Sequence, residues 1–372
     1  MHGVIACRMP ASSTDDAFAP EAQAAARAVA AATPLLEAAV AARVTPGAVL
    51  QVAGPAGAGA VVAVGAEGYG GAAVEPGTAY DLASLTKVTA CLPALLHLID
   101  NGAVRYSDRV DRFFSNAGWM QEPSLGGVTV ADLVLHRSGL AAWRPLFATV
   151  RGREMVLANV LQSSLCEERG LNVYSDLGVI VLTAIIERAA GMRLDDFVCT
   201  HVYAPLGMNA TRFGPLGEGA GVAATEDDGL RGLLVGRVHD ENADAMEGVS
   251  GHAGLFGTAA DLTSYGQAWL RFSGPFAGPE TMRYAVTDLS DGEGVRRGVL
   301  WRLAAEGWPF GGGFTPSAFG HTGFTGTSIV IDPELGCVAT LLTNRVHPRR
   351  GSADGIVRLR RAVHVAVAEA FA

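Results

Sequence analysis

The stretch "YDLASLTKVTACL", residues 80–92, contains Lys87, which is the only lysine in the chain. The sequence has 28 lysines and arginines together, so the other 27 basic side chains are arginines. Lys87 follows Ser84 by three residues, and the apolar segment after it predicts a helix to about Asn101. If Ser84 opens this helix, the two side chains lie on one face, one turn apart. The spacing therefore places an amine within reach of a serine hydroxyl.

A serine and a lysine at this spacing can form a catalytic pair. A serine hydroxyl is a poor nucleophile unless a base lies beside it. Burial and the positive end of a helix both lower the pKa of a lysine, whereas an arginine keeps its proton in proteins. The helix start also leaves backbone N–H groups, including that of Ser84, free to stabilise an oxyanion. The alternative is that Ser84 caps the helix and Lys87 is a surface charge, but the uniqueness of the lysine favours catalysis.

A second candidate site lies in "NVYSDLGVIVL", residues 172–182, just before a strongly apolar helix. Ser175 or Asp176 fits the cap of that helix, and Tyr174 fits its start as a packing residue. A tyrosine beside a serine and a lysine can also relay a proton between nucleophile, base and leaving group. The residues by themselves leave both interpretations of Tyr174 open.

The third candidate site is "FGHTGFTGTSIVIDPE", residues 319–334. It predicts a strand that starts at "HTG" and turns through glycines. Glycine at such a point lets bare backbone approach a ligand. His321 is then a candidate polar contact or proton carrier.

Taken in order, "SLTK", "YSD" and "HTG" resemble the three motifs of the serine β-lactamase and penicillin-binding protein superfamily. The flanking segments "LVLHRSGL", residues 133–140, and "GVSGHAGLFGTAADL", residues 248–262, also resemble that superfamily. The similarity runs from about residue 25 to the C-terminus. It is greatest to the class C-like branch, which also contains serine esterases, D-amino-acid peptidases and amide hydrolases.

The resemblance implies a role for each matching residue. Ser84 is the acylated nucleophile, Lys87 is the base that activates it, and Tyr174 is the proton relay to the leaving group. The backbone N–H groups of Ser84 and Phe324 form the oxyanion hole. The substrate-binding residues are Asp176, His321, Thr322, Gly323 and, with weaker support, Arg345, which follows the last predicted strand.

Two residues depart from the β-lactamase pattern. Asp176 stands where β-lactamases usually carry an asparagine, and a carboxylate there favours the ammonium form of Lys87, against the pKa lowering expected from burial. His321 replaces a lysine that helps to bind the β-lactam carboxylate. We therefore expect an ester or amide hydrolase that works through an acyl-enzyme. The alternatives are a true β-lactamase or D-Ala-type peptidase, and a non-catalytic ligand-binding or sensor module.

The pattern of elements predicts the fold class. A helix over 21–44 and a hairpin of strands 48–54 and 60–68 come first, and helical patterns fill the middle to about residue 247. Strands over 298–303, 327–333 and 337–344 and a helix over 353–371 close the chain. We predict an α/β (α+β) fold of the β-lactamase and transpeptidase type, in which both chain ends form one antiparallel sheet flanked by the terminal helices. The predicted units are a disordered leader (1–20), a sheet domain (21–82 plus 248–372) and a helical domain (83–247), with the active site between the domains.

Net charge and the length of the apolar runs limit which kinds of partner we expect. A net charge of -9 and a pI near 5.5 argue against nucleic-acid binding. The longest apolar runs, such as residues 179–186, fall short of the roughly 20 residues of a membrane span. We expect a small-molecule ester, amide or β-lactam as the substrate. A cytoplasmic location is expected for the sequence as written; a periplasmic protein or lipoprotein, suggested by "VIAC" before Cys7, would require a misassigned start.

Metal and cofactor binding receive little support. The five cysteines lie at wide, irregular spacing, so we expect reduced structural thiols and no metal or organic cofactor. His239, Asp240, Glu241 and His252 are a weaker candidate metal set, because their spacing does not aim them together. Ser250 in "GVSGHAG" is a weaker candidate nucleophile, because the motif lacks the final glycine of a nucleophile elbow.

Overall fold

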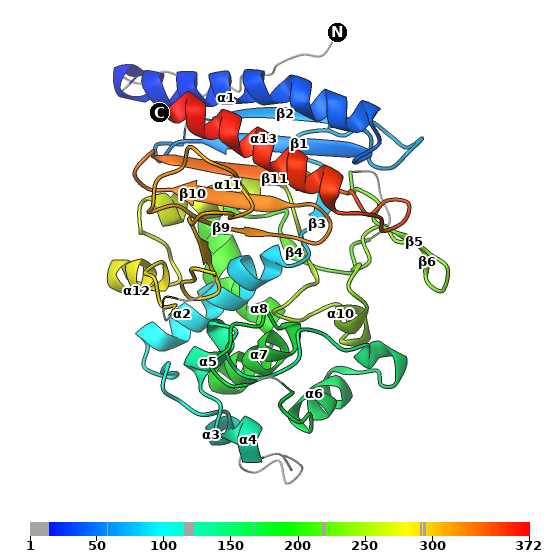
Figure 1. The fold of residues 1–372 in the computed structure, drawn as a ribbon, viewed down its shortest axis with the longest axis vertical. Coiled ribbons are helices and arrows are strands. Elements are labelled where there is room, and N and C mark those ends of the chain that lie inside the picture. The colour runs from blue at the N-terminus through cyan, green and yellow to red at the C-terminus, as the bar shows by residue number, and fades with distance from the viewer. Residues whose placement is uncertain are drawn as a thin grey trace.

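The computed structural model describes residues 15–57, 59–114, 123–166, 168–217, 221–290, 292 and 295–372. Within them a helix layer, an antiparallel sheet and a mostly helical region lie one above the other (Figure 1). The first and last helices lie side by side over one face of the sheet, and the middle of the chain forms the helical region on the other side (Figure 1). The predicted fold class is therefore confirmed.

The main sheet is antiparallel and takes its strands from both ends of the chain. Its order is β2-β1-β11-β10-β9-β8. Central strands β1 and β11 are buried along nearly their whole length, which accounts for their continuous apolar sequences. The strands are β1 (Gly47–Ala53), β2 (Gly59–Gly65), β8 (Arg302–Leu303), β9 (Phe319–Thr322), β10 (Ser328–Asp332) and β11 (Cys337–Thr343).

Two predicted strands differ from the observed ones. The strand expected over 298–303 shortens to β8, because Leu300 has a left-handed backbone (φ +60°) that ends regular pairing. The strand expected to start at "HTG" instead ends at Thr322, so Gly323 begins the turn to β10. This difference places the turn, rather than the strand, next to the candidate nucleophile.

The terminal helices α1 (Asp15–Ala41) and α13 (Asp354–Phe371) cover the outer face of the sheet. Alanines on α1 such as Ala28 and Ala32 are fully buried, and small side chains there let α13 pack closely against it. The helix overlaps the predicted disordered leader, because residues 15–20 belong to α1. Residues 1–14 of that leader lie outside the described residues.

The segment Pro20–Ala41 is long and apolar enough to cross a membrane by length and composition. This segment is not among the longest apolar runs of the sequence analysis, because its apolar residues are mostly alanines. Its buried face belongs to a core cluster with the sheet and α13, which accounts for the apolar character without a membrane. A cytoplasmic location stays a prediction.

The inner face of the sheet packs against α11 (Ala259–Leu270), and below it lies the buried helix α7 (Asp176–Ala190). The short sheet β3-β7-β4 leads the chain from the main sheet to the helix that starts after Ser84. The other α-helices are α2 (Leu92–Asp100), α3 (Val110–Phe114), α4 (Pro123–Gly126), α5 (Val130–Val134), α6 (Arg153–Leu161), α8 (Leu194–Val198), α9 (Ala204–Leu206), α10 (Glu241–Ala245) and α12 (Pro279–Ala285). Lys87–Cys91 and Cys199–Tyr203 are π-helical, and Leu146–Ala148 is a 3-10 helix. The short strands are β3 (Tyr80–Asp81), β4 (Arg212–Phe213), β5 (Asp227–Asp228), β6 (Gly232–Leu233) and β7 (Leu255–Gly257).

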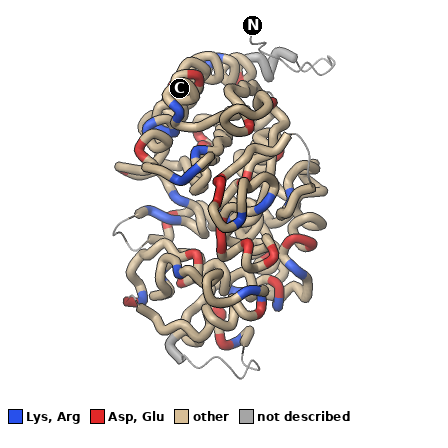
Figure 2. The backbone as a smooth tube through the Cα atoms, turned by 90° about the vertical axis from the view of Figure 1, so that its right-hand side faces the viewer, with Lys and Arg blue, Asp and Glu red and all other residues tan. Residues whose placement is uncertain are grey.

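Acidic and basic residues are interspersed along the backbone in the view of Figure 2. A cavity of about 610 Å³ has both signs of charge in its lining, including Asp228, Arg231, Glu241 and Arg350. Glu241 and Arg350 also line the cavity next to Ser84, so the two cavities adjoin.

Candidate active site

Ser84 lies in a tight turn between β3 and the following helix. Ala83 just before it has a left-handed backbone (φ +48°), an uncommon conformation for a residue with a Cβ. The Asp81 carboxylate holds this turn, because Oδ1 accepts a hydrogen bond from the Ala83 N–H at 2.8 Å. Ser84 remains partly exposed while its neighbours are buried. The turn therefore presents the hydroxyl to the cleft.

Lys87 is fully buried beneath Ser84. Its Nζ lies 3.0 Å from Ser84 Oγ and donates a hydrogen bond to the His252 carbonyl at 2.9 Å. It also forms an ion pair with Asp176 Oδ1 at 2.7 Å. The structure thus brings together residues of the first two sequence motifs.

The charge state of Lys87 corrects one expectation. Burial alone would lower the pKa of Lys87, but the Asp176 carboxylate and the Tyr174 hydroxyl outweigh it, and the pKa of Lys87 is raised. Lys87 is therefore an ammonium ion at neutral pH in the unliganded protein. Unlike an arginine, a lysine at this position can still give up its proton when an acceptor takes it.

Tyr174 stands at the entrance to α7, and its ring centroid is 5.0 Å from Lys87 Nζ. Its hydroxyl interacts with the Ser84 and Lys87 side chains, and burial raises its pKa despite the lysine charge. Tyr174 is therefore a neutral phenol at neutral pH, able to donate a proton. Ser175 caps α7, because its Oγ accepts the Gly178 N–H at 3.1 Å.

His136 is a supporting residue that the sequence interpretation missed. Its Nδ1 accepts the Ser175 N–H at 3.1 Å, and its ring centroid lies 4.7 Å from that of Tyr174. It thereby fixes the segment that carries Tyr174. His136 lies in "LVLHRSGL", one of the segments that resemble the superfamily, and this is the sequence signal for it.

The turn after β9 packs directly on the Ser84 turn. Thr325 Oγ1 donates to the Asp81 carbonyl at 2.8 Å, and Thr327 Oγ1 donates to the Leu82 carbonyl at 3.1 Å. Gly323 leaves no room for a side chain, since a Cβ there would lie 2.1 Å from Thr327 Oγ1. The third motif is thus fastened to the first through side-chain hydroxyls.

Two backbone N–H groups beside Ser84 Oγ are free to bind an anion. Those of Ser84 and Phe324 donate to no acceptor among the residues that the structure describes. Unpaired N–H groups in such a turn suit a developing oxyanion. Both residues line the cleft.

Two cavities meet at Ser84. One, of about 330 Å³, lies toward β8 and β9, and the other, of about 410 Å³, lies toward α7 and α10. Ser84, Tyr174 and Phe324 line both. The first also includes Arg297, Arg302, Pro309, Phe310, His321, Thr322 and Gly323, and the second Ala83, Ala142, Trp143, Asp176, His239, Asp240, Glu241, His252, Ala253 and Arg350.

The smaller cavity contains two arginines that the sequence interpretation did not single out. Arg297 is only 6% exposed, donates to Asn172 Oδ1 at 3.1 Å, and has no carboxylate partner in the described ranges. Burial lowers its pKa to about 10. Arg302 lies nearby with a buried Nε that has no hydrogen-bond acceptor in the described part of the chain. These uncompensated guanidinium groups make this side of the cleft an anion-accepting environment.

His321 lines the same cavity as a neutral ring. Its Nδ1 donates to the Thr322 carbonyl at 3.0 Å. Burial, followed by the positive charges of Lys87 and Arg297, holds the pKa of His321 well below its usual value. The positive charge expected from a lysine at this motif position is therefore supplied by arginines.

Arg345 lies behind the cleft wall. Its Nε donates to the Phe324 carbonyl at 2.8 Å, and its Cζ lies 4.7 Å from the Phe324 ring centroid. It is not among the described residues lining the two cavities at Ser84. The contact supports the Phe324 backbone instead.

The weaker candidates have other partners. Ser250 is fully buried, with Oγ 2.7 Å from His252 Nδ1, and His252 Nε2 lies 2.9 Å from Asp240 Oδ1. His239 Nε2 lies 3.0 Å from Glu226 Oε2. Across the described ranges, no group of three or more His, Cys, Asp or Glu side chains is placed to hold a metal ion. Ser250 is inaccessible to a substrate.

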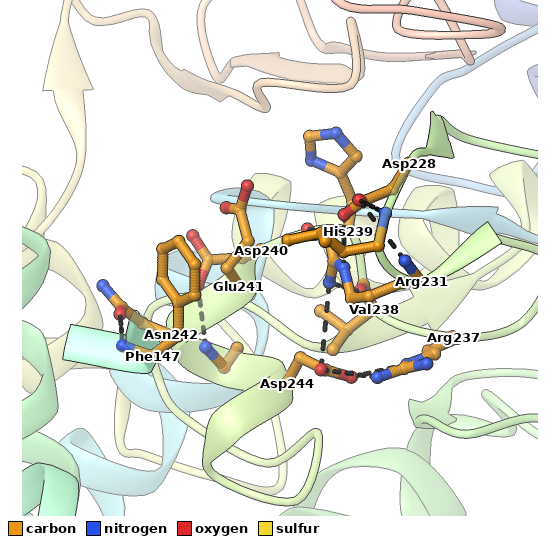
Figure 3. A network of polar contacts seen from close by, with 12 residues as sticks. Phe147, Asp228, Arg231, Arg237, Val238, His239, Asp240, Glu241, Asn242 and Asp244 are labelled. Carbon is orange, nitrogen blue, oxygen red and sulfur yellow. Dashed lines mark hydrogen bonds and ion pairs between the residues drawn. The ribbon is translucent and has the colours of Figure 1, made fainter. Parts of the chain in front are cut away.

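A polar network holds the cleft wall formed by residues 238–241 (Figure 3). Arg231 lies between Asp228, which its Nε contacts at 2.6 Å, and the backbone carbonyls of Val238 and His239, to which its two terminal nitrogens donate at 3.3 and 2.9 Å. The Arg231 side chain is only 8% exposed. The wall is therefore tied to the β5–β6 hairpin.

Comparisons with known proteins agree with this arrangement. A family model described as Beta-lactamase matches residues 32–363. A putative D-alanyl-D-alanine carboxypeptidase from Escherichia coli is 32% identical over 308 residues, covering 73% of this chain and 70% of that protein. An N-acetylmuramyl-L-alanine amidase from Bacillus subtilis is 31% identical over 305 residues, covering 73% and 68%. A solved hydrolase with promiscuous acyltransferase activity superposes with a TM-score of 0.73 at 18% identity, covering 92% of this chain and 99% of that one.

The match over most of its length places the chain in the Beta-lactamase family. The predicted family and the predicted enzyme class, a serine hydrolase, are confirmed. The solved structure, at 18% identity, supports the fold alone.

Proposed function

We propose that the protein hydrolyses an ester or amide bond through an acyl-enzyme on Ser84, and that its substrate carries an anionic group close to the scissile bond. The observation that carries the first part is the contact of Ser84 Oγ with Lys87 Nζ at 3.0 Å, with Asp176 Oδ1 2.7 Å from the same nitrogen. The pair lies at the meeting point of two cavities, where a substrate carbonyl can reach the hydroxyl.

The charge state of Lys87 requires a proton acceptor before attack. In the proposed mechanism, the reacting form carries Lys87 as the neutral amine after its proton has passed to solvent, and this amine takes the proton of Ser84 Oγ as the oxygen attacks the carbonyl carbon. The backbone N–H groups of Ser84 and Phe324 stabilise the oxyanion. Tyr174, a neutral phenol, donates its proton to the leaving group and is reprotonated from Lys87. In deacylation, the Lys87 amine takes a proton from the water that attacks the acyl carbon, and it returns this proton to Ser84 Oγ as the acid leaves.

The anionic group is proposed to lie toward Arg297 and Arg302. A buried guanidinium without a counter-ion is costly, and a carboxylate of the substrate would offset that cost with charge-assisted hydrogen bonds. Thr322 and Gly323 line the same cavity and complete the proposed binding strand. Arg345 has a supporting role, holding Phe324 from behind.

The names of two relatives are compatible with this chemistry. One is a putative D-alanyl-D-alanine carboxypeptidase and the other an N-acetylmuramyl-L-alanine amidase, and both names denote amide hydrolases. We also propose that residues 21–82 and 248–372 form the sheet domain, that residues 83–247 form the helical domain, and that the active site lies between them. This division is supported by two contacts beside Ser84: Lys87 pairs with Asp176 within the helical part, and Thr325 donates to the Asp81 carbonyl within the sheet part.

The test combines labelling with substrate preference. Intact mass after treatment with a fluorophosphonate should show one adduct on the native protein and none on Ser84→Ala. Values of kcat/KM should then be compared for nitrocefin, short-chain p-nitrophenyl esters and D-amino-acid amides, with each ester tested in a neutral and a carboxylated form. Arg297→Met should lower the preference for the carboxylated form by about tenfold or more, because it removes one charge-assisted contact.

Two outcomes would contradict the proposal. Labelling that persists in Ser84→Ala would refute the assignment of Ser84 as the nucleophile. An unchanged preference in Arg297→Met would remove the anion subsite while leaving the acyl-enzyme chemistry intact. Arg271→Met is a matched control, because Arg271 is an exposed arginine that donates to the Pro55 carbonyl instead of lining either cavity.

A further inference from the structure

We propose that Asp81 is a positioning residue for the reaction, which holds the strained turn before Ser84 and couples it to the opposite wall of the cleft. Asp81 contacts neither Lys87 nor the cavity, so its action on catalysis is indirect. The proposal rests on Ser84 being the nucleophile, which the labelling of the native protein tests separately.

The contacts of Asp81 reach both sides of the cleft. Its side chain is buried, and each carboxylate oxygen accepts one backbone N–H: Oδ1 from Ala83 at 2.8 Å and Oδ2 from His239 at 2.7 Å. Ala83 immediately precedes Ser84, while His239 lines the larger cavity at Ser84. One carboxylate therefore fixes the distance between the nucleophile turn and the wall.

The turn needs such a restraint. The left-handed backbone of Ala83 (φ +48°) is disfavoured for alanine and persists only where its surroundings enforce it. Thr325 Oγ1 holds the Asp81 carbonyl at 2.8 Å, and Thr86 Oγ1 holds the Ala83 carbonyl at 2.6 Å. Without the Asp81 bond, the Ala83 N–H would have no partner among these contacts. A relaxed turn would move Ser84 Oγ away from Lys87 Nζ.

The wall is restrained from its other side as well. Arg231 donates to the His239 carbonyl at 2.9 Å (Figure 3). The His239 N–H donates to Asp81 at 2.7 Å, so the backbone of His239 is held on both sides of its Cα. The polar contacts therefore run from the β5–β6 hairpin through His239 to the Ser84 turn. Asp81 is the element of this connection that touches the turn.

The experiment uses Asp81→Asn, which keeps the size of the side chain but leaves one acceptor oxygen for two N–H donors. The readouts are the rate of Ser84 labelling by a fluorophosphonate, kcat and KM for p-nitrophenyl acetate, and Tm. We expect the labelling rate and kcat to fall by about 100-fold, as for a nucleophile displaced by about 1 Å, with KM changed less than about threefold.

A second substitution separates strain from general damage. Ala83→Gly lets the turn adopt the left-handed backbone without a Cβ penalty. In Asp81→Asn it should restore labelling by about tenfold, the equivalent of the left-handed penalty of alanine. If Asp81→Asn does not fold, Thr325→Val, which removes the hydroxyl bonded to the Asp81 carbonyl, should show a smaller loss with the same rescue.

Asp261→Asn is the matched control. Asp261, in the first turn of α11, accepts hydrogen bonds from the Ala210 N–H and the Thr211 hydroxyl. It does not line either cavity at Ser84. The rate of Ser84 labelling in Asp261→Asn should match that of the native protein. Asp81→Asn with a native labelling rate, a loss confined to KM, or a loss that Ala83→Gly does not repair would each overturn the proposal.

Discussion

Asp176→Asn should shift the pH dependence of Ser84 acylation to lower pH, because it removes the charge that keeps Lys87 protonated. At 2.7 Å, two unit charges interact by about 1.5 kcal/mol in water and about 6 kcal/mol at an effective dielectric constant of 20. These limits correspond to about 1 to 4 pKa units. The Asp176 side chain is 18% exposed and Lys87 is fully buried, so we expect a shift of about 2 units.

The assay is the second-order rate of fluorophosphonate labelling at Ser84 from pH 5 to pH 10, which reports acylation without deacylation. Native protein and Asp176→Asn should give parallel curves, with the acid limb of the variant lower by about 2 pH units. At a pH on the acid limb of the native protein, Asp176→Asn should therefore be labelled faster than the native protein. Tm should be compared at each pH to exclude unfolding.

The sign of the stability linkage separates this effect from a loss of structure. The pKa of Lys87 is raised in the folded protein, so its stabilising contribution is fully present below the unfolded value of 10.5 and is lost only as pH rises through the raised value. Titration of Lys87 thus leaves stability constant across neutral pH. An acid limb that stays in place or moves to higher pH would refute the reasoning. Glu187→Gln, which removes the partly buried partner of Arg153 at another site, is the control.

Three further predictions follow from the contacts. Lys87→Arg should abolish Ser84 labelling with Tm retained within a few degrees, because a guanidinium keeps its proton; labelling at a native rate would contradict the assigned base. Gly323→Ala should lower both activity and stability, the latter by roughly 1–3 kcal/mol, because its Cβ would lie 2.1 Å from Thr327 Oγ1; Gly77→Ala, with open space around it, is the control. His364, with its pKa lowered by burial from 6.5 to about 3, gives stability that is full above pH 6.5 and is lost as pH falls toward 3. The free energy of unfolding in urea should fall between pH 7 and pH 5 by about 2 kcal/mol more for the native protein than for His364→Gln. An equal fall in both proteins would contradict this assignment.

The sequence determined the elements whose periodicity is strong and local. The alternation from an Ala-rich helix to Val-rich strands at one end, and from strands to an amphipathic helix at the other, predicted a shared sheet because strands with apolar faces need partners to bury them. The lone lysine three residues after a serine predicted the contact between these two side chains, since residues at this spacing on a helix lie on one face. Local signals failed at Leu300, where a left-handed backbone ends the pairing of a strand-like segment.

The tertiary structure decided which distant groups meet. Residue identity alone made the Lys87 pKa ambiguous; the 2.7 Å approach of Asp176 settled it in favour of the ammonium. Arg345 follows the last strand as the sequence suggested, yet it contacts Phe324 from behind. The cleft is lined instead by Arg302, in a segment that the sequence pattern marked only as a strand, and by Arg297 just before that segment. Asp81 was visible in "YDLASLTKVTACL", but its bond to His239 joins residues 158 positions apart. Helical and strand periodicity report neighbours a few residues away, whereas the charges and restraints around Ser84 come from segments that only folding brings together.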